Sequence, residues 1–287
     1  ADLDGDNITD WLVGASYSSI QTQFGGELYI GVSSNWLNLN SENTISSFHR
    51  VIGDQLGGRF GYSGPCKHDL DGDKEIDILI GEPFGDNDLD AQGSIYIFSA
   101  ANLQTSMSPD MATKKLIGIG ENDWLGWSID TGDMDGDGFP EILSGAPGAN
   151  EATGKAYIWR GEDLANSETL RPRYRLSGEN EQDGFGRSVL ITDYNGDGYQ
   201  DAIIGSPRHA EPNSESNQYD AGIFYVFLGT LNFRNWTPLR PATTADYFSE
   251  GNKTYLRTGQ FILGHDINKD DATDLLVLQR LPNQQNA

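Results

Sequence analysis

Short apolar runs recur five times along the chain, and an acidic residue stands directly in front of each one. The runs are four residues long and begin at residues 11, 78, 142, 202 and 275, and four of the five end in glycine. A short, continuous apolar run is typical of a strand that is buried on both faces. The pattern therefore predicts five buried strands, one in each unit of a repeat.

A second kind of strand follows the first four runs. It opens on glycine and has an alternating pattern, over residues 26–30, 93–98, 154–159 and 222–227. A further strand is expected to end near residues 51–53, 116–118 and 176–178, and no segment has sustained helical periodicity. Each unit of about 60 residues is therefore predicted to form four antiparallel strands. Such units, repeated radially, make a β-propeller.

The residues in front of each apolar run form a nine-residue loop with an oxygen-bearing side chain at positions 1, 3, 5 and 9. The loops begin at residues 2, 69, 133, 193 and 266, so successive starts lie 67, 64, 60 and 73 residues apart. In four of the loops a glycine at position 4 allows a turn tight enough for these side chains to converge. The backbone carbonyl at position 7 can supply one more oxygen.

Such a set of oxygens suits Ca²⁺, which takes about 6–8 oxygen ligands, whereas Mg²⁺ requires a stricter octahedron and zinc would need His or Cys ligands. We therefore predict up to five Ca²⁺ ions, one per loop. The predicted ligands, including the position-7 residues for their carbonyls, are Asp2, Asp4, Asp6, Ile8 and Asp10; Asp69, Asp71, Asp73, Glu75 and Asp77; Asp133, Asp135, Asp137, Phe139 and Glu141; Asp193, Asn195, Asp197, Tyr199 and Asp201; and Asp266, Asn268, Asp270, Ala272 and Asp274.

Two other interpretations of the loops remain. An EF-hand closes with Glu at position 12 and has helices on both sides, so a strand directly after position 9 argues against it. A metal-free acidic turn is the usual explanation for one such loop, but five copies in register favour a metal. Loop five is the weakest site, because Lys269 replaces the glycine and Asn268 lowers the charge, as Asn195 does in loop four.

The residues around the loops form a further repeated pattern. Phe60-Gly61, Trp124-Leu125-Gly126 and Phe185-Gly186 stand before loops; Gly81-Glu82-Pro83, Gly145-Ala146-Pro147 and Gly205-Ser206-Pro207 follow apolar runs; and Gly93 and Gly222 open Gly-x-x-Tyr-x-Phe segments. This order resembles the FG-GAP repeat of integrin alpha-subunit propellers. Similar repeats occur in glycosylphosphatidylinositol-specific phospholipase D and in bacterial surface proteins. The resemblance covers nearly the whole chain and implies that the loop between the first and second strands binds calcium.

The repeat also departs from this pattern in places. Repeat three has Trp-Leu-Gly in place of Phe-Gly, repeat five has only Thr258-Gly259-Gln260-Phe261, and repeat one begins at its calcium loop. We expect five blades, the first and last incomplete, in a single β-propeller region with repeats near residues 1–53, 54–118, 119–178, 179–255 and 256–287. Propellers of the family that it resembles usually have seven blades, so the chain is expected to be part of a longer protein.

Charge and cysteine content restrict the function further. The net charge of −24 argues against binding to nucleic acid, and 18 of the 43 acidic residues are predicted ligands, so that five Ca²⁺ would bring the charge to about −14. The only cysteine, Cys66, excludes an internal disulfide. Because extracellular modules bind calcium with a Kd of about 10⁻⁴–10⁻³ M, we expect an extracellular or cell-surface protein. Asn235 and Asn252 are candidate glycosylation sites, and the sequon at Asn7 is attributed to chance.

Two classes of function remain open. A calcium-stabilised adhesion or scaffold module would bind a protein or glycan through loops on the face opposite the calcium loops, and could also contact other subunits or blades. The loops of that face are residues 16–25, 82–92, 145–153 and 206–220, with connections 53–59, 118–123 and 178–184. The alternative is the accessory propeller of a larger enzyme or a structural subunit of a surface assembly. The chain has no hydrolase or phosphate-binding motif. The tripeptide Arg160-Gly161-Glu162 nearly matches an adhesion motif, and we attribute this likeness to chance.

Overall fold

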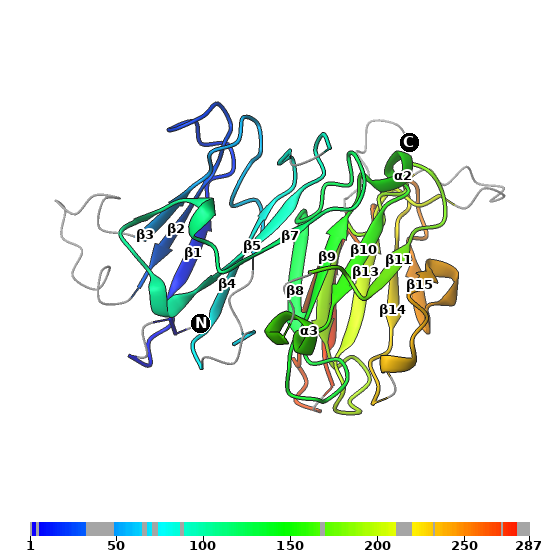
Figure 1. Ribbon diagram of the computed structural model, residues 1–287. Coiled ribbons are helices and arrows are strands. Elements are labelled where there is room, and N and C mark those ends of the chain that lie inside the picture. The colour runs from blue at the N-terminus through cyan, green and yellow to red at the C-terminus, as the bar shows by residue number, and fades with distance from the viewer. Residues whose placement is uncertain are drawn as a thin grey trace. The chain divides into compact units, whose positions relative to one another are not determined.

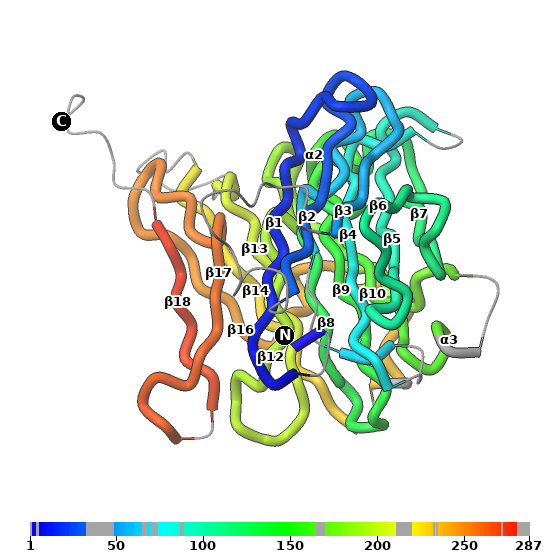
Figure 2. The backbone as a smooth tube through the Cα atoms, turned by 90° about the vertical axis from the view of Figure 1, so that its left-hand side faces the viewer, coloured from blue at the N-terminus to red at the C-terminus, as the bar shows by residue number. Residues whose placement is uncertain are grey.

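Strands carry most of the regular structure, and the helices are short (Figures 1 and 2). The computed structural model describes residues 2–3, 6–32, 49–64, 68–70, 74–86, 89–166, 170–210, 220–231, 233–270 and 272–279. Within these residues, no helix has the length and apolar character needed to cross a membrane. The helical elements are α2 (Ala149–Ala152), α3 (Gly161–Asn166) and 3₁₀ turns at Ala100–Asn102, Pro109–Met111, Phe233–Asn235 and Ala242–Thr244.

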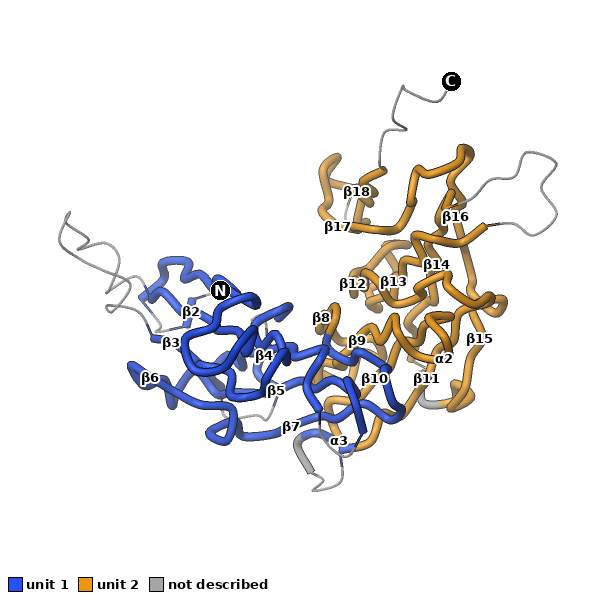
Figure 3. The backbone as a smooth tube through the Cα atoms, turned by 90° about the horizontal axis from the view of Figure 1, so that it is seen from above, with its two compact units in different colours: residues 1–126, 164–170 blue, residues 127–163, 171–287 orange. Residues whose placement is uncertain are grey.

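Two compact units divide the chain (Figure 3). Unit 1 comprises residues 1–126 and 164–170, and unit 2 comprises residues 127–163 and 171–287. Unit 1 contains one sheet with the order β1-β2-β3-β6 and one with the order β4-β5-β7. Their strands are β1 (Trp11–Gly14), β2 (Glu27–Gly31), β3 (His49–Ile52), β4 (Asp77–Glu82), β5 (Ser94–Ser99), β6 (Ser106–Met107) and β7 (Lys114–Ile117).

Unit 2 contains three sheets, with the orders β8-β9-β10-β11-β15, β12-β13-β14-β16 and β17-β18. The strands of the first are β8 (Ser128–Gly132), β9 (Glu141–Ala146), β10 (Lys155–Trp159), β11 (Tyr174–Ser177) and β15 (Leu239–Pro241). Those of the second and third are β12 (Ser188–Thr192), β13 (Asp201–Ser206), β14 (Ile223–Phe227), β16 (Tyr247–Glu250), β17 (Phe261–His265) and β18 (Asp274–Leu278). The prediction of an all-β chain with repeated antiparallel sheets is confirmed.

Two strands were not predicted, and both are parallel to their neighbours. β6 pairs with β3, and β15 pairs with β11. Each lies in the segment between the third and fourth strands of one repeat and extends the sheet of the preceding repeat. The prediction of purely four-stranded antiparallel units was therefore incomplete, because these added strands satisfy backbone groups at an otherwise open sheet edge.

The five apolar runs differ in burial. β4, β9 and β13 are buried at every position, as predicted. The prediction is wrong for β1 and β18, where Val13, Leu276 and Leu278 are about half exposed. β1 lies in the first sheet of unit 1 and β18 in the last sheet of unit 2, and each has a neighbouring sheet on only one side within its own unit.

Neighbouring sheets meet where two glycines face each other. A Cβ atom added to Gly145 would lie 1.8 Å from the carbonyl oxygen of Gly186, and one added to Gly205 would lie 1.9 Å from that of Gly259. The first glycine of each pair ends the apolar run, and the second occupies the glycine position of the Phe-Gly motif in the next repeat, where Thr258 replaces phenylalanine before Gly259. The motif thus specifies a backbone-to-backbone contact that leaves no room for a side chain.

A serine hydroxyl adds a hydrogen bond at the same contact between neighbouring sheets. Ser128 donates to the carbonyl oxygen of Gly186 at 2.9 Å, and Ser188 donates to that of Gly259 at 2.7 Å. In unit 1, Ser63 makes the equivalent bond to Gly126 at 2.6 Å. This serine is the fourth residue of the Phe-Gly-x-Ser pattern, which explains why it recurs with the glycine.

The residue before the motif glycine fills the space between sheets. Phe60, Leu125 and Phe185 are fully buried, and Thr258 is nearly so. Each forms an isolated parallel bridge with the glycine that opens the third strand of the preceding repeat: Gly26, Gly93, Gly154 and Gly222. Repeats three and five therefore keep the backbone geometry of the motif although they lack its phenylalanine.

Gly205→Ala should destabilise the protein by about 1–3 kcal/mol, because the new methyl group would meet a backbone carbonyl that cannot move aside. Urea unfolding followed by tryptophan fluorescence measures this loss. Ser249→Ala, at an exposed position of the same sheet, is the matched control and should change stability by no more than about 0.5 kcal/mol. Equal stability of the two variants would show that the glycine contact is dispensable.

Candidate metal centres

Each predicted calcium loop leads into a second strand of its repeat, so the strand fixes the acid at position 9. Asp77, Glu141 and Asp201 are the first residues of β4, β9 and β13 and are fully buried, whereas Asp274 begins the more exposed β18. Asp10 directly precedes β1 and is 4% exposed. Burying a carboxylate is costly unless hydrogen bonds or a cation compensate for it.

One hydrogen bond recurs in all five loops. The backbone N–H of position 2 donates to the carboxylate of position 9, which ties the two ends of the loop together. The pairs are Leu3 to Asp10 at 2.6 Å, Leu70 to Asp77 at 2.7 Å, Met134 to Glu141 at 2.8 Å, Tyr194 to Asp201 at 2.9 Å and Ile267 to Asp274 at 3.0 Å. The loops therefore share one local fold as well as one sequence pattern.

The carboxylate at position 1 organises the turn. In loop three, Asp133 accepts hydrogen bonds from the N–H groups of Gly136, Asp137 and Gly138 at 2.7–3.2 Å. In loop four, Asp193 accepts the same three bonds at equivalent positions. These bonds wrap the loop around its first side chain, so that positions 3 and 5 are held close to position 1.

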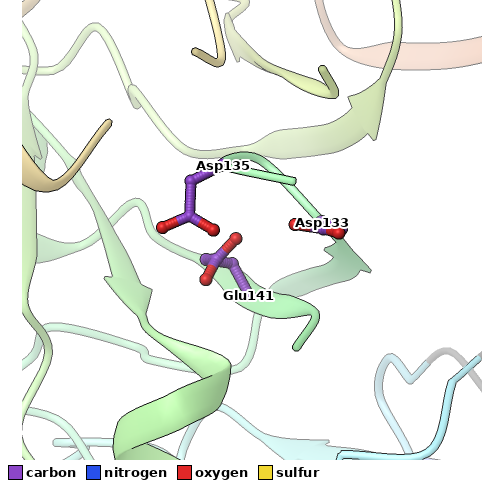
Figure 4. Close-up of side chains that lie close together, drawn as sticks. All are labelled: Asp133, Asp135 and Glu141. Atoms are coloured by element: carbon purple, nitrogen blue, oxygen red, sulfur yellow. The ribbon is translucent and has the colours of Figure 1, made fainter. Parts of the chain in front are cut away.

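Loop three brings three carboxylates together (Figure 4). Asp133, Asp135 and Glu141 each place an oxygen so that all three atoms lie within 4.8 Å of one another. Two oxygens bound to one Ca²⁺ at about 2.3–2.6 Å can be separated by at most about 5 Å. The three groups therefore fit a single calcium ion, and among the described residues no other acidic or histidine cluster is as tight.

The electrostatics of these loops also favour a cation. Burial raises the pKa of Glu141 to about 8; hydrogen bonds from Met134 and Gly161 oppose this rise, and the charges of Asp135 and Asp137 add to it. Burial likewise raises the pKa of Asp201 to about 6. A carboxylate whose charged form is this unfavourable lacks a compensating positive charge, which a bound cation would supply.

The fourth predicted side chain of loop three has a different neighbour. Asp137 Oδ2 lies 3.8 Å from Nη2 of Arg160, which also pairs with Glu162. Arg160 is only 9% exposed. The side chain of Arg160 is thus turned toward loop three, and the interpretation that the likeness of this tripeptide to an adhesion motif arises by chance stays a prediction.

Among the described residues, the predicted ligands of the other loops do not form a cluster as tight as that of loop three. Asn195 donates to Asp197 at 2.9 Å, and Asn268 accepts from the N–H of Asp270 at 2.9 Å, so both amides stay within their loops. Asp4, Asp71 and Asp73 lie outside the described residues. The metal roles of all five loops stay predictions, as do the carbonyl roles of the position-7 residues. The candidate glycosylation sites Asn235 and Asn252 are exposed. The single cysteine, Cys66, lies outside the described residues.

Two backbone N–H groups that donate to the position-9 carboxylates were not predicted from the sequence. The N–H of Gly161 donates to Glu141 Oε1 at 3.4 Å, and the N–H of Gly229 donates to Asp201 Oδ1 at 2.7 Å. Both glycines lie two residues after the third strand of their repeat. That shared spacing was the available signal, and a Cβ atom at either position would lie less than 3 Å from backbone atoms of the loop segment.

In calcium-free protein, stability should fall as pH rises, because the pKa of Glu141 is raised on folding from its ordinary value of 4.5 to about 8. The contribution is complete below about pH 4.5 and is lost as the pH approaches 8. Urea unfolding in EDTA at pH 5 to 8 should show a loss of stability that exceeds the loss in Glu141→Gln by more than about 1 kcal/mol. Parallel pH profiles for the two proteins would contradict this assignment.

The similarities to known proteins fall on the same repeats. The FG-GAP repeat model matches residues 125–159 and 185–227. Integrin alpha-PS3 of Drosophila melanogaster is 33% identical over 176 residues, which are 59% of this chain and 14% of that protein. Human integrin alpha-8 is 27% identical over 221 residues, which are 72% of this chain and 19% of that protein.

A third relative belongs to another class of protein. Phosphatidylinositol-glycan-specific phospholipase D of Dictyostelium discoideum is 26% identical over 240 residues, which are 76% of this chain and 25% of that protein. The chain therefore spans a quarter or less of the length of these relatives. The repeat pattern, the antiparallel sheets and these matches agree: the chain contains FG-GAP repeats, and more than half of it is similar to integrin alpha subunits.

Proposed function

We propose that the chain is a calcium-stabilised extracellular interaction module that mediates adhesion or binds a protein or glycan partner. The observation that carries this proposal is the buried carboxylate cluster of loop three, repeated as one hydrogen-bond pattern in four further loops. Similarity to integrin alpha subunits supports the adhesion role and the cell-surface location. Each loop is proposed to hold one Ca²⁺ through the ligands given above, up to five in all.

The finer architecture belongs to the same proposal. We infer that the sheets are blades of a β-propeller, and that further blades bring their number to the seven usual for the family. The exposed apolar side chains of β1 and β18 support this inference, since the faces of inner blades are covered by their neighbours. Other blades or subunits are then partners of these faces.

The proposed ligand face lies at the end of the strands away from the calcium loops. In unit 2, β13 begins at Asp201, the last residue of loop four, and ends at Ser206. Six residues of strand span roughly 17–20 Å, so the loop after Ser206 is well separated from the metal. Loops on a rigid scaffold are the usual place for binding residues.

A second candidate function is supported by the similarity to a phospholipase D. The chain would then be an accessory propeller, with catalysis located outside these residues. Sequence motifs for hydrolysis are absent from the chain, and its clustered acids are accounted for by the calcium proposal. In either case the chain itself is proposed to bind a partner, to be stabilised by calcium and to carry no active site.

Removing calcium should destabilise the protein strongly. Each site that binds only the folded state contributes about 1.4 kcal/mol when calcium is at ten times its Kd, and the freed carboxylates repel one another. Calorimetry should show a large fall in Tm in EDTA and full recovery with excess Ca²⁺, but little recovery with Mg²⁺. An unchanged Tm in EDTA would refute the proposed calcium stabilisation.

A single substitution should remove one site without harming the metal-free fold. Asp135→Asn takes one charge from the carboxylate cluster of loop three, so calcium bound per chain should fall by about one when calcium is at ten times the Kd of the unaltered site. The stability gained on adding calcium should fall by about 1.4 kcal/mol at ten times Kd, while stability in EDTA should stay equal or rise. Equilibrium dialysis and urea unfolding measure the two effects.

The matched control is Asp163→Asn, which changes an exposed acid in α3. It should leave both the calcium count and the calcium-dependent stability unchanged. An equal loss of bound calcium in the two variants would mean that general surface charge, and no defined site, attracts the ion.

A further inference from the structure

A histidine and two glutamates line one cavity of unit 2, outside the nine-residue loops. The cavity has a volume of about 370 Å³, and His209, Glu179 and Glu250 are part of its lining. Its walls come from β14, β16 and the segment that follows β11, and none of the predicted calcium ligands lines it. A nitrogen ligand and carboxylates in one space are the donor set of a transition-metal site, which the all-oxygen loops cannot offer.

The backbone of His209 is held by hydrogen bonds on both sides. Its N–H donates to the carbonyl oxygen of Ser206 at 3.2 Å, and its carbonyl oxygen accepts from the N–H of Gly222 at 3.0 Å. The residue as a whole is 6% exposed. A buried side chain on a fixed backbone keeps one orientation, and a binding site is precise only when its ligands are oriented in advance.

Asp183 determines which nitrogen of the imidazole is free. Oδ2 of Asp183 lies 2.7 Å from Nδ1 of His209, and Asp183 is 4% exposed. A carboxylate only accepts hydrogen bonds, so Nδ1 carries the proton in this contact. In the neutral ring the lone pair then lies on Nε2. Histidines that bind a metal through one nitrogen usually donate the other N–H to a carboxylate or a carbonyl in this way.

The free nitrogen faces Glu250. Oε1 of Glu250 lies 3.9 Å from Nε2 of His209, which is too long for a hydrogen bond. A nitrogen and an oxygen bound to one Zn²⁺ at about 2.0–2.2 Å are about 3.4 Å apart in a tetrahedral site and at most about 4.3 Å apart. The observed separation lies between these limits. The side chain of Glu250 is 35% exposed, so it has room to adjust to a metal ion.

The charge around the cavity favours a cation. Burial alone would lower the pKa of His209, but the hydrogen bond and charge of Asp183, with the charges of Glu179 and Glu250, raise it above its ordinary value. Among the described residues that line the cavity, none is lysine or arginine. The negative field that favours a proton on the imidazole also attracts a metal ion, which displaces the proton from Nε2 when it binds.

We propose that His209 and Glu250 form a binding site for a divalent transition-metal ion of the Zn²⁺ class. Glu179 adds a carboxylate on the same cavity, and Asp183 is a positioning residue that holds the imidazole with Nε2 toward the metal. The bound ion joins the segment after β13, which carries His209, to the last residue of β16. The proposal goes beyond the calcium role proposed above and does not depend on it, because no residue is shared.

The test is a calorimetric titration of the full chain with ZnCl₂ in saturating calcium. We expect one high-affinity Zn²⁺ per chain. The same titration, followed by ¹⁵N NMR of the histidine rings, needs no substitution. Nε2 of His209 should move to the shift of a metal-bound nitrogen while Nδ1 keeps its proton, and the rings of the other histidines should change little.

Matched variants locate the ion. His209→Asn keeps an N–H donor on the side of Asp183 but lacks Nε2, and it should weaken Zn²⁺ binding at least tenfold, as should Glu250→Gln. His265→Gln removes an exposed histidine at the end of β17, and Glu181→Gln removes an exposed acid that does not line the cavity. Both controls should bind Zn²⁺ as the unaltered protein does.

Asp183→Asn tests the positioning role. It removes the charge beside Nδ1, so Zn²⁺ affinity should fall about 10–100-fold, as is usual when the partner of a ligand histidine is changed. In metal-free protein, the pKa of His209 measured by NMR should fall as well, since the charge of Asp183 raises it. An unchanged pKa and unchanged Zn²⁺ affinity would remove Asp183 from the site.

Three outcomes would overturn the proposal: no Zn²⁺ binding in saturating calcium, binding that both His209→Asn and Glu250→Gln leave unaltered, or NMR changes confined to other histidines. Thermal unfolding of each variant in calcium checks that the fold is retained. A protein that gains stability from Ca²⁺ but does not bind Zn²⁺ contradicts only the site at His209. A protein that binds Zn²⁺ there but gains no stability from Ca²⁺ contradicts only the calcium proposal.

Discussion

The contact between two glycines of neighbouring repeats is the constraint on which the rest of this fold depends. Gly145 and Gly205 each approach a glycine carbonyl so closely that not even a methyl group fits between them. Because both sides of this contact are backbone, neither can yield by changing a side-chain rotamer, and the spacing of the sheets is fixed. A serine hydroxyl donates a hydrogen bond to the same carbonyl. This directional bond fixes the position of one sheet along the other, which non-directional packing alone would not do.

Fixed sheets place the second strands β4, β9 and β13 in the interior, and this placement makes it costly to bury the charged carboxylate at the start of each of these strands. The acid at position 9 begins the strand, so the geometry that buries the strand also buries the carboxylate. Backbone donors compensate in part: Asp201 receives N–H groups from Tyr194 and Gly229, and its pKa is still raised to about 6. Glu141 also receives two N–H groups, but the bond from Gly161 is 3.4 Å long, and its pKa is raised to about 8, so a cation would stabilise this loop most.

Much of this could be predicted from the sequence because the repeat places like residues in like environments. Apolar runs, glycines and loop acids each follow from local chemistry, and they located the principal strands and the nine-residue loops. β6 and β15 are only two and three residues long and carry no periodic signal, so their parallel pairing could not be seen. The exposure of β1 and β18 depends on which sheets lie beside them, which no local pattern encodes. Asp183, His209 and Glu250 likewise converge only after β12, β13, β14 and β16 pair.

The two ends of the strands in each repeat differ in how regular their hydrogen bonds are, and a tyrosine of the third strand shows the difference. Tyr29, Tyr96 and Tyr225 occupy equivalent positions in the third strands, and each donates its hydroxyl to a glutamate at 2.8 Å. The glutamate comes from a different place each time: Glu27 from the same strand, Glu82 from the end of the second strand, and Glu179 from the connection between repeats. At the end that carries the nine-residue loops, by contrast, every loop repeats the same bond from position 2 to position 9. A scaffold whose spacing is set by backbone contacts leaves the acids at the other end of the strands free to vary, and that freedom suits the ligand face proposed above.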